Sequence, residues 1–348
     1  MRKKKIFLGG YINHINAQNI NCKSISKHLD KEKYIIKTLV LGSENIPNIT
    51  GVTYIRVYTF LYSISNLIAY IRAVFWADVC YVPKHQSTPK FALRIAPLFG
   101  TKIFTTIEGN MCDTRLKSMI DSFGSIDKMN NYFKYIVNIF GITKHLIQNS
   151  TCGVNINNKP LVLGVEHKEL NFNQPRKSLK NIIFVGSLIK RKRVDEFITL
   201  STLYPDIEFK IVGKGSEMSN LQDNAPSNVK FFGGVSQNVL DDLFSSSQLL
   251  YLPSFSEGFP KVILEAASAG VPSLVYDTYG ASDWIEHRKD GFIASSFSDV
   301  EAIVDEILNN PELLQKVSKN TEDLANRFDW TNIIYAWEHV IQNLYNGE

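Results

Sequence analysis

The sequence is poor in cysteine and lacks the cysteine spacings that bind metals or carry redox chemistry. Its 348 residues include four cysteines, and no two of them form a C-x-x-C pair. Such wide spacing argues against a zinc site and against a redox motif. We therefore expect four half-buried thiols, no disulfide framework and a cytoplasmic location, where thiols stay reduced. These cysteines are Cys22, Cys80, Cys112 and Cys152.

Long apolar runs are also missing. No stretch reaches the roughly 20 apolar residues that span a bilayer, and the densest one, residues 61–79, is interrupted by Arg72 and Asp78. The apolar run after the basic start is too short for a signal peptide, so residues 5–8 are interpreted as a first β-strand. A hydrophobic content of 44% is ordinary for a globular protein, and the length suits two domains.

Three functional signatures are absent as well. Residues 9–14, GGYINH, do not form the G-x-G-x-x-G turn of a dinucleotide-dependent oxidoreductase. No helix-turn-helix, RNP or zinc-finger pattern supports a nucleic-acid-binding protein. No D-x-D motif suited to holding a divalent cation occurs. We therefore expect no dinucleotide cofactor, no metal and no nucleic-acid partner.

Short apolar runs alternate with helix-like segments along the whole chain. Apolar runs of this length suit strands buried on both faces, and helical patterns between them indicate βαβ units. Two such series predict an α/β protein with two Rossmann-like domains, residues 1–168 and 169–329, joined near residues 164–175. A helical spacing of apolar residues predicts a closing helix over residues 330–345. The expected strands are residues 5–8, 35–41, 79–82, 102–107, 145–148, 160–163, 181–185, 208–212, 230–232, 248–252 and 272–276.

Charge is divided unevenly between the two halves. Residues 1–168 hold 22 Lys and Arg against 9 Asp and Glu, a net charge of +13, whereas residues 169–348 carry −9. By charge alone, the first half suits membrane lipid, a lipid-linked phosphate or nucleic acid, and the missing nucleic-acid motifs argue against the last; an accident of composition is the alternative. Aromatic and basic residues that could dock on a membrane, or belong to the core, are Tyr58, Phe60, Tyr62, Tyr70, Arg72, Phe75, Trp76, Lys84, Tyr132, Phe133, Lys134, Tyr135 and Phe140.

Loops that follow strands are the places where doubly wound sheets bind ligands. After residues 181–185, Gly186 permits a tight turn, and the four cations of residues 190–193 precede a helix that begins near Val194. Cations oppose the dipole at a helix N-terminus, and a bound diphosphate would offset that cost. A solvated basic turn is the alternative. Gly213 and Gly215, and later residues 277–281, form glycine loops that ordinary turns explain equally well.

The most informative loop is residues 252–266, LPSFSEGFPKVILEA. It predicts a strand, a loop and a helix that starts near Pro260, because proline is favoured at the first helical position. Amides at that helix N-terminus would point beyond the strands. Glu257 lies in the loop and Glu265 a turn into the helix, so both carboxylates can border one cleft. Each carboxylate could accept two hydrogen bonds from a vicinal diol of a sugar or ribose.

Together these residues resemble the retaining nucleotide-sugar glycosyltransferases of family four, whose E-x7-E motif matches Glu257 through Glu265. The resemblance is specific over residues 181–293 and looser elsewhere. It implies the GT-B fold, with two parallel sheets facing a central cleft and a C-terminal helix, residues 330–348, that crosses back to the first domain. It also implies a nucleotide-sugar donor, retention of anomeric configuration and no requirement for a metal.

The resemblance assigns expected roles on the donor side. Glu257 would bind hydroxyls of the donor sugar, and Glu265 would bind the ribose. The family's phosphate loop maps onto Gly186, Ser187 and Lys192, with its first cation replaced by Ser187 and its glycine by Arg193. Lys190 or Arg191 would supply the missing cation, and Lys192 and Glu257 are the expected catalytic residues here. The expected donor-binding residues are Gly10, Gly186, Ser187, Arg191, Lys192, Gly213, Gly234, Glu257, Gly258, Phe259, Pro260, Lys261, Val262 and Glu265.

The first half matches the family less closely. Gly9 and Gly10 take the place of a glycine loop after the first strand, which faces the donor phosphates and the acceptor. Where the family often has Thr-Val-His, this chain has Thr-Ile-Glu ending at Glu108. Glu108 therefore replaces a histidine that would touch the donor sugar, and it is a further catalytic candidate. Glu108 and His85 both follow expected strands and are candidates for the acceptor site.

The resemblance implies transfer of a hexose-type sugar from a UDP- or GDP-sugar to a glycan or polyprenyl-diphosphate-linked acceptor, as in capsule or O-antigen assembly. Lys192 and helix amides would neutralise the leaving diphosphate, and the sugar would pass through an oxocarbenium-like state. We expect peripheral attachment to the anionic inner face of the plasma membrane. A catalytically inactive sugar-nucleotide-binding partner of another glycosyltransferase stays open as an alternative, because it would keep Glu265.

Overall fold

The computed structural model describes residues 2–113, 118–150, 152–166 and 176–347. The chain divides into two compact units. Unit 1 comprises Met1–Gly164 and Trp330–Glu348, and unit 2 comprises Val165–Asp329. The predicted boundary after residue 168 and the predicted start of the second domain near Asn171 lie outside the described residues.

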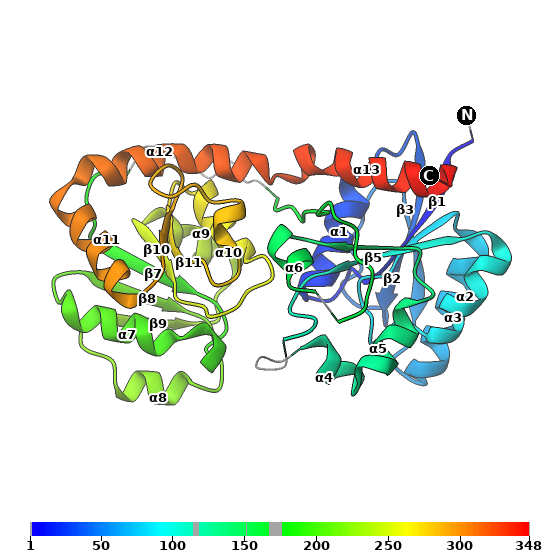
Figure 1. Ribbon diagram of the computed structural model, residues 1–348, viewed down its shortest axis with the longest axis horizontal. Coiled ribbons are helices and arrows are strands. Elements are labelled where there is room, and N and C mark those ends of the chain that lie inside the picture. Colours follow the sequence, from blue (N-terminus) through cyan, green and yellow to red (C-terminus); the bar gives the residue numbers. More distant parts are fainter. Residues whose placement is uncertain (1, 114–117, 151, 167–175, 348) are drawn as a thin grey trace. The chain divides into compact units, whose positions relative to one another are not determined.

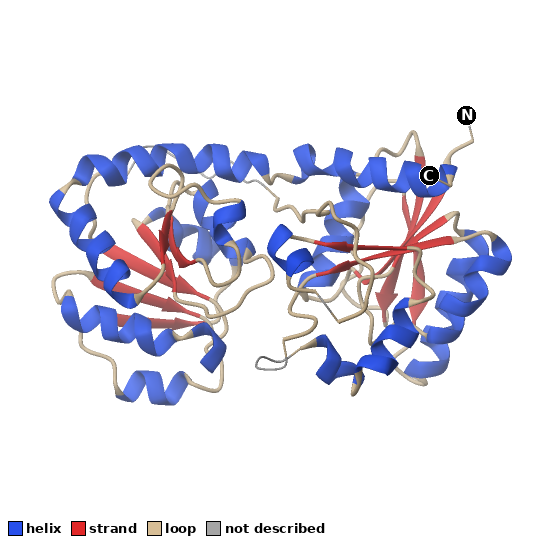
Figure 2. Ribbon diagram, viewed as in Figure 1, coloured by secondary structure: helices blue, strands red, loops and turns tan. Residues whose placement is uncertain are grey.

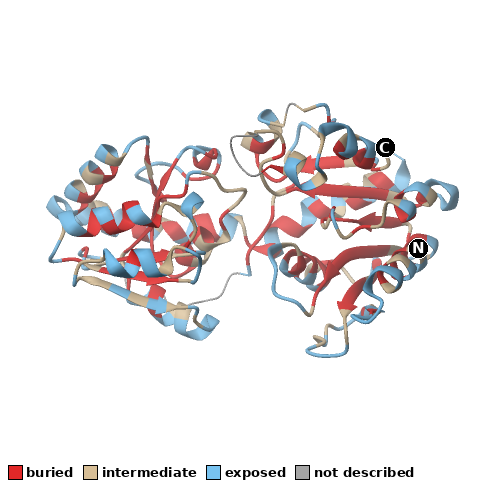
Figure 3. Ribbon diagram, turned by 90° about the horizontal axis from the view of Figure 1, so that it is seen from below, coloured by how far each residue is buried: buried red, intermediate tan, exposed pale blue. Residues whose placement is uncertain are grey.

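Unit 1 is built on a parallel six-stranded sheet in the order β3-β2-β1-β4-β5-β6, flanked by helices (Figures 1 and 2). Its central strands are rich in aromatic and β-branched residues and are buried, as expected for strands covered on both faces (Figure 3). Its strands are β1 (Lys4–Tyr11), β2 (Tyr34–Leu41), β3 (Val52–Val57), β4 (Val79–Tyr81), β5 (Lys102–Ile107) and β6 (Asn138–Gly141). Its helices are α1 (Ala17–His28), α2 (Tyr62–Trp76), α3 (Lys90–Ile95), η1 (Ala96–Phe99), α4 (Met119–Phe123), α5 (Ile126–Phe133), α6 (Lys144–Gln148) and α13 (Trp330–Asn346).

Unit 2 repeats this architecture with a parallel sheet in the order β12-β11-β10-β7-β8-β9. Its strands are β7 (Asn181–Val185), β8 (Glu208–Val212), β9 (Val229–Gly233), β10 (Leu249–Leu252), β11 (Ser273–Tyr276) and β12 (Phe292–Ala294). Its helices are η2 (Lys190–Lys192), α7 (Val194–Leu203), α8 (Met218–Asp223), α9 (Gln237–Ser245), α10 (Lys261–Ser268), η3 (Ala281–Asp283), α11 (Phe297–Asn309) and α12 (Pro311–Arg327). The predicted α/β class with two parallel, Rossmann-like sheets is therefore confirmed.

The last helix of the chain belongs to unit 1. In α13, the apolar residues predicted to share one face are all buried, and they include Ile333, Trp337 and Ile341. The Trp337 ring packs edge-on to Tyr81, with centroids 5.0 Å apart, and its Nε1 donates to the Val162 carbonyl at 3.0 Å. The side chains of α13 thus complete the core of unit 1 beside β4. Among the described residues, no helix is both long and apolar enough to cross a membrane.

Several expected strands differ from the observed ones. Residues 145–148 form the helix α6, because the Thr143 side chain accepts from the Leu146 amide and caps a helical turn. Residues 160–163 are not a strand. Three strands were missed, namely β3, β6 and β12. β3 is an edge strand of mixed exposure, while β6 and β12 are only four and three residues long, so none shows a long continuous apolar run.

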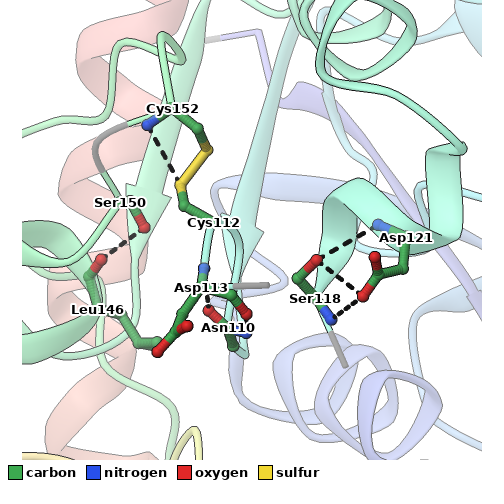
Figure 4. Close-up of a disulfide and its surroundings, with 8 residues drawn as sticks. All are labelled: Asn110, Cys112, Asp113, Ser118, Asp121, Leu146, Ser150 and Cys152. Carbon is green, nitrogen blue, oxygen red and sulfur yellow. Dashed lines mark hydrogen bonds between the residues drawn. A yellow bond between two sulfur atoms is a disulfide. The ribbon is translucent and has the colours of Figure 1, made fainter. Parts of the chain in front are cut away.

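The expectation of four free thiols is wrong. Cys112 and Cys152 form a disulfide with their Cα atoms 5.6 Å apart, and the Cys152 amide donates to Cys112 Sγ (Figure 4). The bond joins the segment after β5 to the segment after α6, which lie 40 residues apart in sequence. Only the fold brings them together, so spacing could not reveal the pair. Cys22 and Cys80 are free and buried, and the argument for a reducing compartment loses its basis.

Candidate functional site

The order of strands creates one reversal point in the sheet of unit 2. From β7 the chain adds β8 and β9 on one side, then returns to add β10, β11 and β12 on the other. The loops that leave the carboxyl ends of β7 and β10 therefore diverge, and doubly wound folds bind ligands in the crevice at such a point. These two loops carry Lys192 and Glu257.

Lys192 and Glu257 form an ion pair at this reversal point. Lys192 Nζ bonds to Glu257 Oε1, and Arg191 Nη1 lies 3.2 Å from Glu257 Oε2. The side chains of Lys192 and Glu257 are only 12% and 9% exposed. Burial alone would raise the pKa of Glu257, but the charges of Lys192 and Arg191 outweigh burial and lower it. Glu257 is therefore an ionised carboxylate fixed between two cations.

The backbone reinforces the contact between these two loops. The amide of Phe255 donates to the carbonyl of Arg191 at 3.0 Å. The guanidinium of Arg191 also donates to the carbonyl of Ser256. An ammonium has three N–H donors, so Lys192 can donate to other acceptors besides Glu257. The arrangement can present fixed positive charge to an anion while its carboxylate accepts hydrogen bonds.

Glycines allow neighbouring loops after the strands to pack backbone to backbone. A Cβ on Gly213 would lie 1.8 Å from the Gly186 carbonyl oxygen, and one on Gly215 would lie 2.1 Å from the Leu188 oxygen. The Gly213 amide donates to the Gly233 carbonyl at 2.8 Å. Close packing between loops is therefore a sufficient reason for the G-x-G pattern, and the ligand contact expected of Gly213 stays a prediction.

Other predicted donor residues lie on the same edge of the sheet. A Cβ on Gly186 would be 3.7 Å from Lys192 Nζ, so this glycine adjoins the ammonium. Ser187 is exposed in the same loop. Gly234 follows β9, and a Cβ there would lie 3.3 Å from Lys214 Cε. Gly186, Ser187 and Gly234 thus belong to loops at the carboxyl ends of β7 and β9.

The loop between β10 and α10 is anchored by aromatic packing. The Phe259 ring lies 5.0 Å from Trp284 and 5.3 Å from Phe328, measured between centroids. This cluster fixes the loop on the C-terminal side of Gly258. The sequence motif alone did not reveal this packing role for Phe259.

The helix that follows starts one residue later than predicted. Pro260 is the N-cap, and α10 begins at Lys261. Amides at a helix N-terminus point out of the helix; in the first turn of α10, which starts with Lys261 and Val262, the Ile263 amide donates to the Pro260 carbonyl at 3.0 Å. Glu265 lies one turn further along and is half-buried. The α10 N-terminus and Glu265 are thus part of the same short element that follows the Glu257 loop.

A buried polar network that the sequence did not reveal lies beside the cationic loop. Glu196, 8% exposed, accepts hydrogen bonds from the hydroxyls of Tyr251 and Tyr276 and forms an ion pair with Arg193. The guanidinium of Arg193 also lies 5.1 Å from the Tyr276 ring centroid. Arg193 has φ of 49°, the left-handed region that favours glycine, where the resembled family has glycine. These side-chain contacts oppose the backbone strain.

Unit 1 has the corresponding reversal point between β1 and β4. A cavity of about 470 Å³ lies there. Gln18 Nε2 donates to the Pro83 carbonyl at 2.9 Å and joins the two diverging segments. Amides and hydroxyls predominate in the lining, which is suited to uncharged hydrogen-bonding ligands. The lining residues are Asn16, Gln18, Lys84, His85, Gln86, Ser87, Gly109, Asn110, Ser118, Met119, Ser122 and Phe123.

His85 lies in the wall of this cavity. Its Nε2 is 2.7 Å from Thr105 Oγ1, and its ring packs edge-on to Phe133 with centroids 5.0 Å apart. Burial lowers the pKa of His85 to about 4. The imidazole is therefore neutral at physiological pH, so it can accept or donate a hydrogen bond but carries no charge.

Glu108 follows β5 and is surrounded by neutral donors. Its Oε1 accepts from Thr106 Oγ1 at 3.2 Å and from Tyr81 at 3.5 Å, and its Oε2 accepts from Asn21 at 3.3 Å. These contacts fix the carboxylate at the carboxyl edge of the sheet. Its catalytic role stays a prediction.

Gly9 and Gly10 do not form a loop, because β1 continues to Tyr11. A Cβ on Gly10 would lie 2.7 Å from Cys22 Cβ, so Gly10 lets α1 approach the strand. A Cβ on Gly9 would likewise lie 2.9 Å from the Tyr70 hydroxyl. Packing therefore accounts for both glycines. Among the described residues, no group of three or more His, Cys, Asp or Glu side chains could hold a metal ion.

Solved structures share this architecture over the whole chain. Sucrose-phosphate synthase from Thermosynechococcus elongatus superposes with a TM-score of 0.80, 13% identity and coverage of 99% of this chain and 100% of the other. HepE of Anabaena in complex with UDP gives a TM-score of 0.75 at 15% identity, with 98% and 100% covered. At such identities the likeness concerns the fold alone. Two Rossmann-like units with parallel sheets are characteristic of the GT-B fold, and this chain has that fold.

Residues 166–324 match the sequence model of the family described as Glycosyl transferases group 1. This range contains the loops of Lys192 and Glu257. The match covers less than half of the chain, and this segment of unit 2 is similar to the group 1 glycosyltransferases.

Curated relatives match less than half of the chain. An uncharacterized glycosyltransferase of Haemophilus influenzae is 30% identical over 175 residues, which cover 47% of this chain and 49% of the relative. The alpha-galactosylglucosyldiacylglycerol synthase of Streptococcus pneumoniae is 27% identical, with 45% and 44% covered. The UDP-Gal:alpha-D-GlcNAc-diphosphoundecaprenol alpha-1,3-galactosyltransferase of Escherichia coli is 28% identical, with 38% and 36% covered. The chain therefore spans half or less of the length of these relatives.

Proposed function

We propose that the protein is a retaining, metal-independent glycosyltransferase that moves a hexose-type sugar from a UDP- or GDP-sugar to a glycan or polyprenyl-diphosphate-linked acceptor. The observation that carries this proposal is the half-buried contact of Lys192 and Arg191 with Glu257 at the reversal point of unit 2. In such a site the cations can bind a diphosphate, and the adjacent carboxylate can accept hydrogen bonds from sugar hydroxyls.

The chemistry follows from how charge develops during transfer. Cleavage of the bond between the sugar and the diphosphate leaves negative charge on the phosphate, and the sugar gains oxocarbenium character. Lys192, Arg191 and the first-turn amides of α10 would stabilise the leaving diphosphate without a metal. Glu257 would hold the sugar hydroxyls, and Glu265 would hold the ribose. In this scheme the leaving phosphate accepts the proton of the acceptor on the same face, so configuration is retained and no enzyme nucleophile forms.

The acceptor would bind to unit 1. Its cavity is lined mainly by amides and hydroxyls, which can exchange hydrogen bonds with uncharged sugar hydroxyls, and His85 is kept neutral there. Relatives named for diacylglycerol-linked and undecaprenol-linked substrates support an acceptor attached to a lipid. We therefore propose a role in surface polysaccharide assembly, such as capsule or O-antigen, by an enzyme at the cytoplasmic face of the plasma membrane.

A donor panel tests the proposal. Full-length protein would be heated with UDP-, GDP- and ADP-sugars at up to millimolar concentration, because a ligand that binds only the folded state raises the Tm. We expect a UDP- or GDP-sugar to raise the Tm and then to give a labelled product with a polyprenyl-diphosphate-linked acceptor. Absence of any response to all donors would contradict the proposal.

A catalytically inactive sugar-nucleotide-binding partner of another glycosyltransferase is the second candidate. It is favoured by Glu108, which stands where the resembled family has a histidine. Such a protein would be stabilised by the donor but would neither transfer nor slowly hydrolyse the sugar. Release of free UDP or GDP from the donor on prolonged incubation separates the two, because only an active enzyme produces it.

A further inference from the structure

The helix α2 of unit 1 exposes apolar residues where surface helices usually carry charge. Its buried face consists of Asn66, Ala69, Tyr70, Ala73 and Val74, so small and polar residues predominate there. Its outer face carries Ile64, 57% exposed, and Phe75, 59% exposed, with Ile68 between them. A surface helix normally places its apolar stripe toward the core. Helix α2 therefore presents an apolar face, Ile64, Ile68 and Phe75, to its surroundings.

The apolar surface extends beyond the helix at both ends. Before the helix, Phe60 and Leu61 are 83% and 60% exposed. At its other end, the Phe75 ring lies 3.9 Å from the Phe99 ring, measured between centroids, and the neighbouring Leu98 is exposed too. Helix α2 lies beside α3 (Figure 1), and it also packs against η1, which carries Leu98 and Phe99. Extended exposed apolar patches of this kind mark interaction surfaces.

The segment that leads into the helix is held in an unfavourable conformation. Leu61 is the N-cap of α2 with φ of 55°, and no side chain caps the helix there. Glycine, asparagine or aspartate usually occupies such a left-handed position, and a bulky residue is an outlier. A polar cap would stabilise the helix better. Exposed Phe60 and Leu61 at this turn are therefore unfavourable for folding in water and favourable for contact with an apolar phase.

The charge of this region is of one sign. The elements that form it, α2, α3 and η1, contain Arg72, Lys90 and Arg94 and no acid, and the first acid after α2 is Asp78. The Asp78 carboxylate accepts from the Lys5 amide at 2.7 Å, which ties it to the start of β1. On the apolar face itself, Arg72 is exposed between Ile68 and Phe75. An apolar surface interspersed with cations and free of acids complements anionic lipid headgroups above acyl chains.

We propose that the α2 surface, Phe60, Leu61, Ile64, Ile68 and Phe75 with the adjoining Leu98 and Phe99, docks the protein onto an anionic lipid bilayer. The apolar side chains enter the boundary between headgroups and acyl chains, and Arg72 with its neighbouring cations contacts the lipid phosphates. This inference rests on the proposed function only in so far as a lipid-linked acceptor requires access to a bilayer. Docking itself depends on the α2 surface alone.

Vesicle binding tests the proposal without reference to catalysis. Full-length protein would be sedimented with vesicles of phosphatidylcholine alone or of phosphatidylcholine and phosphatidylglycerol in equal parts. We expect binding to the mixed vesicles, weakened by salt, and little binding to phosphatidylcholine. The double variant I64E/I68E should bind the mixed vesicles at least about tenfold more weakly, because each change removes apolar contact and adds repulsion.

A matched control changes two exposed apolar residues to glutamate in helices of unit 2. Val239 in α9 and Leu308 in α11 are also exposed apolar residues, 43% and 40% respectively, and V239E/L308E should bind vesicles like the natural protein. Equal binding by I64E/I68E and the natural protein would overturn the proposal. So would a dimer in light scattering that I64E/I68E converts to a monomer, because the surface would then join two copies. Thermal shifts with the donor panel in the same variants report on the donor site separately.

Discussion

The two units share one sheet topology but carry different chemistry at the reversal point of the sheet. In unit 2 this point holds charged groups, the Lys192–Glu257 pair with Arg191, over the buried Glu196 network. In unit 1 it holds a cavity lined mainly by amides and hydroxyls, with a neutral His85 in its wall. The same fold therefore supplies a position for a ligand, and the side chains at that position decide whether it suits a charged or an uncharged partner.

The comparison predicts the largest effect for the carboxylate between the cations. Replacing Glu257→Gln keeps the shape but removes the charge that fixes Lys192 and Arg191, so turnover should fall by about 100-fold or more. Initial rates with a saturating donor measure this. Glu208→Gln is the control. Glu208 is the first residue of β8, at the edge of the sheet opposite the Glu257 loop, and it pairs with Lys230. This variant should stay within about twofold of the natural rate, and equal losses in both variants would remove Glu257 from the site.

The second largest effect is expected for glycine-to-alanine changes, which should destabilise the loops of unit 2 more than a loop of unit 1. In unit 2, Gly213→Ala would place a Cβ 1.8 Å from the Gly186 oxygen at a φ of 143°, and the free energy of unfolding should drop by about 3 kcal/mol or more. In unit 1, Gly100→Ala has a φ of 72° but no atom within 4 Å, so about 1 kcal/mol should be lost. Urea denaturation of both variants checks the difference. Similar losses would show that the loops of unit 2 can separate easily.

The neutral state of His85 makes unit 1 sensitive to acid. Because burial lowers the pKa of His85 from 6.5 to about 4, the unfolded chain binds more protons in this window. Its contribution to stability is complete above pH 6.5 and is lost as the pH falls toward 4, up to about 3 kcal/mol. Denaturation across this pH range would measure it. His85→Gln should remove that slope, and an unchanged slope in the variant would assign the sensitivity to other groups.

The smallest expected effect comes from removing the hydroxyl of one buried tyrosine in each unit. The two hydroxyls differ in that one bonds to a charged group and the other to a neutral group. Tyr251→Phe removes a donor to the Glu196 carboxylate and should cost about 2 kcal/mol of unfolding free energy. Tyr11→Phe removes a bond of 2.7 Å to the neutral Asn66 amide oxygen and should cost about 1 kcal/mol. Chemical denaturation of the pair tests this order. A larger loss in Tyr11→Phe would reverse the proposed distinction between the units.

Predictability from the sequence differs between strands within both units, since β5 of unit 1 was predicted with its observed bounds and β12 of unit 2 was missed. The strands β7 and β8 were predicted with their observed bounds, because both are continuous apolar runs between clear turns. In unit 1, β3 and β6 were missed and α6 was taken for a strand, because short or half-exposed segments carry no distinct period. Local pattern therefore suffices for long buried strands and fails where neighbours in space decide the structure.

The candidate site shows the same division. The loop of Glu257 and the cationic loop of Lys192 were recognised because both are contiguous motifs. The Cys112–Cys152 bond and the hydroxyl contacts of Glu196 join residues distant in sequence, so no local pattern could predict them. The close approach of Gly213 to Gly186 likewise depends on the neighbouring strand. Pairings of this kind require the folded structure.

Calorimetric titration of UDP into Lys192→Met tests most directly whether the Lys192–Glu257 constellation binds a nucleotide diphosphate. Lys230→Met is the matched control, because Lys230 also pairs with a glutamate in unit 2 but lies on the edge strand β9. We expect Kd to rise by about tenfold or more in Lys192→Met, the loss of a charge-assisted contact, and to stay unchanged in Lys230→Met. Equal affinity in the two variants, or no binding of UDP and GDP by the natural protein, would contradict the account.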